Sequence, residues 1–170
     1  MRKEALFQFI LGRMEFLVAE PIPVAYGGEE AEFPPEREMV KAHLVVELLE
    51  RLGYPLSAVQ VNQFVETEKF GFRVAEVVAS DRRHLPSLLC SVEASSQYEE
   101  RKETALQDLY IQAIALNKEN SLRWLAYYTR WYQHGNLRKK HIVIDYRSFP
   151  TFALWQEAGR PTRPSIPSYF

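Results

Sequence analysis

Two glutamates lie inside otherwise apolar stretches and are the residues whose type and spacing first suggest chemistry. Glu76 stands among Val74, Val77 and Val78, and Glu93 follows the run Leu-Leu-Cys-Ser-Val. A buried carboxylate is strongly destabilising unless a cation, a metal ion or hydrogen-bond donors compensate it. Two of them in neighbouring strands therefore predict a metal-binding or catalytic site. An edge strand that exposes both glutamates to water is an equally good interpretation of this stretch.

The pattern around these glutamates predicts the elements that position them. Strands are expected at residues 59–66, 72–79 and 87–94, joined by short polar turns, which indicates an antiparallel meander. A helix is expected from Pro34 and Pro35 to Gly53, because apolar residues recur there at helical spacing. A second helix is expected over 98–117. An aromatic strand, "LRWLAYYT", a loop or hairpin, and a last strand, "HIVIDY", complete the pattern.

This order of elements predicts an α/β fold with a mixed β-sheet flanked by helices. The long helix between the third and fourth strands permits a right-handed crossover, which joins parallel strands. We expect a nuclease-like core at 34–148, preceded by a helix at 3–19 and a connector rich in proline and glycine, together residues 1–33. Residues 149–170, with four prolines, are expected to form an extended tail on the surface.

Composition narrows the class of protein. The chain has 170 residues, 46% apolar and 25% charged, which is typical of a globular domain. Its single cysteine, Cys90, excludes an internal disulfide framework, favours a reducing compartment and is interpreted as a core residue rather than a nucleophile. No run of eighteen apolar residues or signal-peptide pattern occurs, so we expect no membrane partner and a cytoplasmic location.

The net charge of −1 hides an asymmetry between the two halves of the chain. Residues 1–100 hold 10 lysines and arginines against 17 acidic residues, giving −7, whereas residues 101–170 hold 11 against 5, giving +6. A basic second half is suited to a polyanion such as DNA. The alternative is that the two halves pair with each other within the fold.

Several short motifs follow one another in a fixed order. Glu38 begins a helix that leads into "LGYP" at residues 52–55, and the next strands carry Arg-Val-Ala-Glu-Val, with Glu76, and Glu-Ala-Ser, with Glu93 and Ser95. Gln112 then precedes Leu116-Asn117 on the second helix. Over residues 34–130 this ordered set resembles the N-terminal nuclease-like domain of type I restriction enzyme R subunits, within the PD-(D/E)xK restriction-endonuclease-like superfamily.

The resemblance implies a fold and a set of roles. It implies that Glu38, Glu76, Glu93, Ser95 and Gln112 occupy the catalytic positions, with Glu76 and Glu93 as ligands of Mg²⁺. In such nucleases the metal ion polarises the scissile phosphate and activates a water molecule. Two residues depart from the family pattern: Glu76 stands where an aspartate is expected, and Ser95 where a lysine is expected. Loss of a catalytic group of this kind typically costs ~10²–10⁴ in rate. Lys102 or Lys118 would have to supply the missing ammonium.

A basic, aromatic segment between residues 123 and 141 provides a second candidate site. Arg130, Arg138, Lys139 and Lys140 alternate there with tryptophans and tyrosines, a composition suited to phosphate contact and base stacking. The alternative is that the aromatic residues pack in the core and the basic residues form a solvated turn. No Gly-rich phosphate loop, metal-ligand spacing of His and Cys, or Gly-x-Ser-x-Gly motif occurs.

These observations predict a restriction-endonuclease-like domain whose nuclease site is inactive and which binds nucleic acid or a protein partner. The alternative is an active Mg²⁺-dependent DNA endonuclease with a displaced lysine. No cofactor is expected in the first case and Mg²⁺ in the second. The sequence leaves open both a homo-oligomer and an interaction subunit without nucleic-acid contact.

Overall fold

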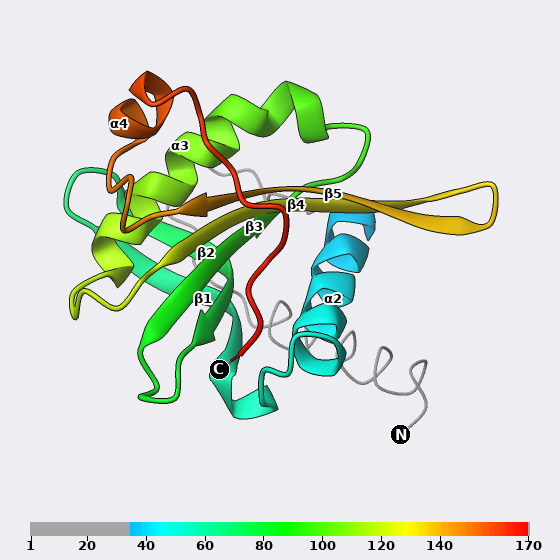
Figure 1. The fold of residues 1–170 in the computed structure, drawn as a ribbon, viewed down its shortest axis with the longest axis horizontal. Coiled ribbons are helices and arrows are strands. Elements are labelled where there is room, and N and C mark those ends of the chain that lie inside the picture. The colour runs from blue at the N-terminus through cyan, green and yellow to red at the C-terminus, as the bar shows by residue number, and fades with distance from the viewer. Residues whose placement is uncertain (1–34, 170) are drawn as a thin grey trace.

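The computed structural model describes residues 35–169, so the helix predicted at 3–19 and its connector lie outside the described residues. The elements follow the predicted order (Figure 1). They are α2 (Pro35–Glu50), the 3-10 turn η1 (Leu56–Ala58), β1 (Val59–Thr67), β2 (Gly71–Ser80), β3 (Pro86–Val92), α3 (Tyr98–Leu116), β4 (Trp124–Gln133), β5 (Asn136–Asp145) and α4 (Phe152–Glu157).

The five strands form one mixed sheet in the order β1-β2-β3-β4-β5. The first three strands pair antiparallel, β3 and β4 are parallel, and β4 and β5 form an antiparallel hairpin. The single parallel pair is joined by α3, because parallel neighbours need a long crossover connection. The predicted α/β fold with a mixed sheet flanked by helices is confirmed.

Helices cover both faces of the sheet (Figure 1). On one face α2 packs Val40, Leu44 and Leu48 against β2, β3 and β4. On the other, α3 packs Leu106 and Leu109 against β1, β3 and β4, with α4 beside it. Cys90 lies in the first of these cores, as predicted, and burial raises the pKa of its thiol, so it is a poor nucleophile.

The start of α3 is fixed to β4 by a pair of tyrosines. The rings of Tyr98 and Tyr127 stack with their centroids 4.4 Å apart. The Tyr127 hydroxyl donates to the Tyr98 carbonyl over 3.0 Å, and the Tyr98 hydroxyl donates to the Tyr127 carbonyl over 3.3 Å. Both hydroxyls are therefore satisfied inside the core, and the loop between β3 and α3 is held against β4.

The β4–β5 hairpin extends beyond the other strands and projects from the molecule (Figure 1). Gln133 pairs with Asn136 across a two-residue turn in which His134 and Gly135 have φ of 49° and 74°. Positive φ at both positions is the geometry that tight hairpins favour. Of the loop and hairpin interpretations of this segment, the hairpin is confirmed.

The C-terminal segment differs from the extended tail that the prolines predicted. Residues Phe152–Glu157 form α4, whose N-terminus is capped by Thr151 and whose Trp155 is buried. The segment is then extended: the Arg163 amide donates to the Val143 carbonyl on β5, Ile166 enters the core beneath α2, and the Tyr169 amide donates to Leu52. The tail thus crosses the β5 edge from one face of the sheet to the other. In residues 35–169 no helix is long and apolar enough to cross a membrane.

Candidate functional site

Glu76 lies in the interior strand β2 and is only 6% exposed. Its Oε2 accepts hydrogen bonds from the Ser91 hydroxyl and the Val92 amide, both over 2.8 Å. Its Oε1 lies 2.9 Å from a guanidinium nitrogen of Arg37, in an ion pair that is not aligned as a hydrogen bond. Both carboxylate oxygens of this predicted metal ligand therefore face protein groups.

Arg37 brings the compensating charge from the first turn of α2. Its Nε also donates to the Val92 carbonyl over 3.0 Å. Burial opposes the charge of the guanidinium, but the attraction of Glu76, Glu93 and Glu38 outweighs it and raises the pKa of Arg37. Arg37 thus contacts Glu76 directly and is attracted over a longer range by Glu93 and Glu38.

Glu93 follows the end of β3 and is 2% exposed. Its Oε1 accepts from the Ala94 amide over 3.0 Å, and its Oε2 lies 3.5 Å from Nε of Arg101 on α3. The Glu93 carbonyl accepts from the Thr129 hydroxyl over 2.7 Å. Because Glu76 and Glu93 are both buried, the interpretation that they are exposed on an edge strand is wrong.

Glu38 belongs to a separate polar contact on α2. It lies 2.7 Å from the ammonium of Lys41, which is fully buried and also donates to the Asn62 side chain over 2.9 Å. Asn62 adopts a φ of 53° within β1, and it lies between residues that pair with either side of Glu76 on β2. Glu38 and Glu76 are therefore held by two different cations of the same helix.

Ser95 lies in the turn before α3, not in a strand. The predicted strand was too long, because β3 ends at Val92 and a turn closes between Ala94 and Gln97. Glu93 and Ser95 thus do not share the strand face that we expected. The Ser95 hydroxyl and amide both hydrogen-bond to Glu36 of α2, over 2.7 and 2.9 Å.

Gln112, the last predicted catalytic residue, is buried on α3. The two lysines proposed as replacements for the missing ammonium lie elsewhere: Lys102 pairs with Glu99, and Lys118 lines a different cleft beside β1. In residues 35–169 neither lysine forms an ion pair or hydrogen bond with Glu76 or Glu93.

The carboxylates do not fit a metal ion in this arrangement. Both oxygens of Glu76 and of Glu93 face amides, a hydroxyl or guanidinium groups. Among residues 35–169, no three His, Cys, Asp or Glu side chains are grouped to hold a metal ion. A magnesium ion needs several oxygen ligands at close range, so Arg37 would have to move before one could bind.

The basic residues of the hairpin divide between its two faces. Lys139 pairs with the buried Glu47 on α2, and Lys140 pairs with Glu99 at the start of α3. Arg130 and Arg138 lie on β4 and β5, and Arg138 is exposed with no ion pair to any residue in the described part of the chain. The aromatic residues divide similarly: those at 124, 127 and 128 are in the core, whereas Trp131 and Tyr132 lie towards the tip.

A groove connects the Ser95 turn to the hairpin. It has a volume of about 280 Å³ and is lined by Ser95, Ser96, Tyr98, Glu99, Thr129, Trp131 and Lys140. One predicted catalytic position and one predicted nucleic-acid contact thus line the same groove, together with an aromatic ring. The other predicted residues lie outside its lining.

Sequence reasoning missed the two cations that hold this site together. Lys41 could have been found, because it falls at helical spacing within the stripe of Leu44, Val45 and Leu48. Arg37 has the same spacing, four residues before Lys41, but an arginine in the first turn of a helix is usually exposed. Only the demand that a buried Glu76 be compensated pointed to it. A comparison with protein-family models and with curated proteins finds no match to this chain.

Proposed function

We propose that this chain is a non-catalytic, restriction-endonuclease-like module that binds nucleic acid along the groove between the Ser95 turn and the β4–β5 hairpin. The observation that carries the proposal is that Ser95, Trp131 and Lys140 line one groove. Ser95, the position where the family resemblance expects a catalytic lysine, thus lies in the same groove as residues of the basic, aromatic hairpin.

The order of elements supports the restriction-endonuclease-like assignment. A helix, three antiparallel strands, a crossover helix and a parallel fourth strand follow one another as the resemblance implies. Glu38 lies on α2, Glu76 on β2 and Glu93 just after β3. These are the positions that the ordered motifs predict.

The contacts of the carboxylates support the loss of catalysis. Arg37 supplies beside Glu76 the positive charge that a metal ion would supply in a nuclease. Ser95 carries no cation and is bonded to Glu36 instead. A site that neutralises its own acidic residues has no free ligand with which to activate water.

The groove offers contacts suited to a single strand. The Trp131 ring can stack on a base, the exposed Ser96 hydroxyl can donate to a phosphate, and Lys140 can neutralise a phosphate. Arg138 is directly opposite Trp131 across the hairpin, so it extends the basic surface beyond the groove.

Binding of a labelled single-stranded DNA, followed by fluorescence anisotropy at several salt concentrations, tests this proposal. We expect affinity to fall with salt, and Trp131→Ala to weaken binding by about 1–3 kcal/mol, because the base no longer stacks on the indole ring. Lys140→Ala should reduce the slope of log affinity against log salt concentration by about 0.7, since one phosphate fewer is neutralised.

The matched control is Arg82→Ala. Arg82 is an exposed cation at the far β2–β3 turn, so this variant should bind as the parent does. No binding at low salt, or equal effects of all three variants, would refute the proposal and leave a protein partner as the alternative.

A metal-dependent deoxyribonuclease is the second candidate function, and one observation favours it. Lys41 is a fully buried ammonium on the same helix as Arg37, beside the Asn62 that neighbours Glu76 in the sheet. If Arg37 moved away, Lys41 is the residue that could act as the displaced lysine. Cleavage lost in Lys41→Met but kept in Lys102→Met would establish this alternative.

A further inference from the structure

The two edges of the sheet are protected very differently. The β5 edge carries Arg138, Lys139 and Lys140, and the C-terminal tail pairs with it at Val143. On the opposite edge, in the part of the chain that the structure describes, no strand pairs with the outer side of β1. The β1 sequence, Val-Gln-Val-Asn-Gln-Phe-Val-Glu-Thr, contains no lysine, arginine or proline. Natural proteins usually protect an edge strand with such residues, because unpaired amides and carbonyls recruit another strand.

Large apolar side chains are exposed beside this unprotected edge. Phe64 on β1 is 46% exposed, and Phe72 on the neighbouring strand is 63% exposed. They lie diagonally across the β1–β2 ladder, since Phe64 pairs with Val74 and Phe72 with Glu66. Ile114 of α3 is exposed on the other face of the sheet. The edge therefore presents unpaired backbone with apolar surface on both sides.

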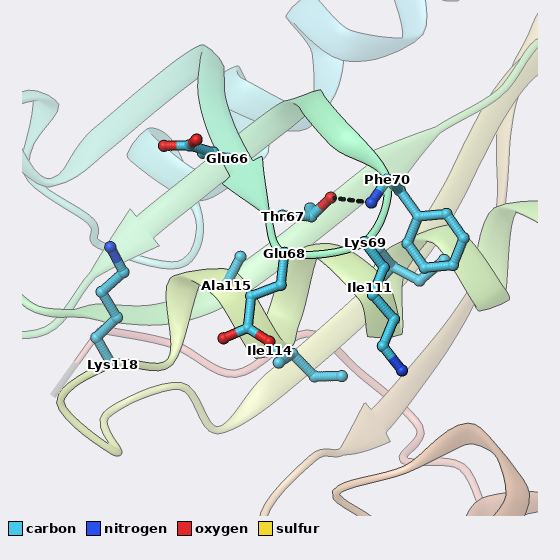
Figure 2. Close-up of a pocket in the computed structure, with 9 residues that line it drawn as sticks. All are labelled: Glu66, Thr67, Glu68, Lys69, Phe70, Ile111, Ile114, Ala115 and Lys118. Carbon is cyan, nitrogen blue, oxygen red and sulfur yellow. Dashed lines mark hydrogen bonds between the residues drawn. The ribbon is translucent and has the colours of Figure 1, made fainter.

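A cleft with an apolar helical wall opens at the C-terminal end of β1. It has a volume of about 750 Å³ and lies between the β1–β2 turn and α3, with Ile111, Ile114 and Ala115 on the helical side and Lys118 at one end (Figure 2). Glu66, Glu68 and Lys69 line it from the strand and turn. At the opposite end of the same strand, in η1, Leu56 is exposed. One edge thus carries an apolar projection at its start and, at its end, a cleft whose helical wall is apolar.

We propose that two copies of this chain pair antiparallel through β1 and form one continuous sheet about a two-fold axis. In an isologous interface both copies contribute the same surface, and the two surfaces are related by a two-fold rotation. A projection at one end of β1 therefore meets the cleft at the other end of the partner strand, and both contacts form twice. If the two-fold axis passes through Gln63, Glu66 of each copy pairs with Gln60 of the other. The one charged residue of β1 therefore does not face the same residue of the second copy. Backbone on either side of Asn62, whose φ of 53° interrupts the strand, pairs between the copies, and Phe64, Phe72 and Ile114 of the two copies supply the apolar contact.

Sedimentation of the full chain over a range of concentrations tests this inference, which is independent of nucleic-acid binding. We expect a dimer. Its dissociation constant should be at least tenfold higher in Phe64→Lys, because a lysine on the edge disfavours strand pairing. Leu154→Lys on α4 is the matched control, since Leu154 is 47% exposed and lies away from β1; it should dimerise as the parent does.

Phe72→Lys gives a second, independent disruption if Phe64→Lys unfolds, and circular dichroism reports the folding of each variant. Hydrogen exchange adds a local readout: amides of Val59–Thr67 should be protected in the parent and exchange faster in the folded lysine variants. A chain that remains monomeric at all concentrations, or a dimer that both lysine variants leave intact, would overturn the proposal. So would a dimer weakened by Tyr132→Lys on the opposite hairpin instead.

Discussion

At the scale of single residues, the ion pair between Arg37 and Glu76 determines what the buried carboxylates can do. The Glu76 carboxylate receives two hydrogen bonds from β3 and lies against the Arg37 guanidinium of α2. Removal of one member of such a pair leaves an uncompensated charge, which is more destabilising than replacement of both members by neutral groups.

Arg37→Met should therefore lower the free energy of unfolding by about 3–5 kcal/mol, measured by urea denaturation. The double variant Arg37→Met with Glu76→Gln is the control, because it removes both charges and should recover part of that loss. A single variant as stable as the parent would show that Arg37 does not compensate Glu76.

Glu47 is a third buried carboxylate, and its partners are Tyr128 and Lys139 of the hairpin strands and Arg51 just after α2. Burial alone would favour its neutral form, but Lys139, the Tyr128 hydroxyl and Arg51 outweigh this and lower the pKa of Glu47. A lowered pKa in the folded state means that the charged form stabilises the fold above the ordinary glutamate range. That stabilisation is lost as pH falls through the folded-state value.

The stability advantage of the parent over Glu47→Gln should accordingly be greatest near neutral pH and shrink below about pH 4.5. Urea unfolding of both proteins at several pH values measures it. Glu50→Gln, near the exposed end of the same helix, serves as the comparison. An advantage that grows with acidity would contradict the lowered pKa.

The sequence indicated the acidic residues of the site but not their partners. Glu76 and Glu93 were recognisable because a charge interrupted an apolar strand pattern. Arg37, Arg101 and Glu36 were not, because each is an ordinary surface residue of a helix until the fold brings it beside a strand. Local pattern shows that a charge needs compensation, whereas only tertiary structure shows which residue provides it.

At the scale of elements, the β4–β5 hairpin is the part of the fold on which the proposed function depends. Its turn requires a left-handed backbone at Gly135, with φ of 74°, and no other atom lies within 4 Å of the position that a Cβ would take. A side chain there would therefore act through backbone strain alone.

Gly135→Ala should destabilise the hairpin by about 1–2 kcal/mol, the usual cost of an L-residue in this conformation. Faster hydrogen exchange at Arg130–Lys140 and weaker DNA binding are the expected readouts. Gly159→Ala is a matched control, because Gly159 has the same type of backbone and equally open surroundings but follows α4. If both variants weaken binding equally, the effect is not specific to the hairpin.

Periodicity predicted β1, β2, β3 and α3 to within two residues at each end, because strands and long helices impose an alternating or 3.6-residue pattern on the core. The strands predicted at 122–129 and 141–146 were too short, because the projecting part of the hairpin has no core to impose that pattern: β4 runs to Gln133 and β5 begins at Asn136. Periodicity also failed for short elements. The six residues of α4 are too few to show a helical period, and the surrounding prolines suggested an extended chain. The end of β3 was misplaced because "EAS" continues the small, strand-compatible pattern into a turn.

At the scale of the whole molecule, the charge asymmetry between the halves of the chain is partly resolved inside the fold. Arg101, Lys139 and Lys140 from the basic half pair with Glu93, Glu47 and Glu99 from the acidic half. The two interpretations of the asymmetry are thus not exclusive, since Arg138 stays exposed while these pairs form. Glu99 is the exposed acidic member and competes with any phosphate for Lys140.

Glu99→Gln should therefore tighten binding of single-stranded DNA a few-fold and steepen its salt dependence, because Lys140 becomes available to a phosphate. Anisotropy titrations at two salt concentrations measure both effects. Glu103→Gln is the matched control, since Glu103 pairs with Arg160 away from the groove. Unchanged binding by Glu99→Gln would show that Lys140 does not contact the ligand.

We infer that the chain has kept the nuclease scaffold and a nucleic-acid groove while its own arginine has replaced the metal ion. One labelled DNA incubated with the parent, Glu93→Ala and Trp131→Ala in Mg²⁺ and in Mn²⁺, with binding and cleavage followed in the same samples, tests both halves of this inference together. We predict that the parent and Glu93→Ala bind alike, that Trp131→Ala binds less, and that none of the three cleaves. Cleavage by the parent that disappears in Glu93→Ala would show instead that the metal site is still active.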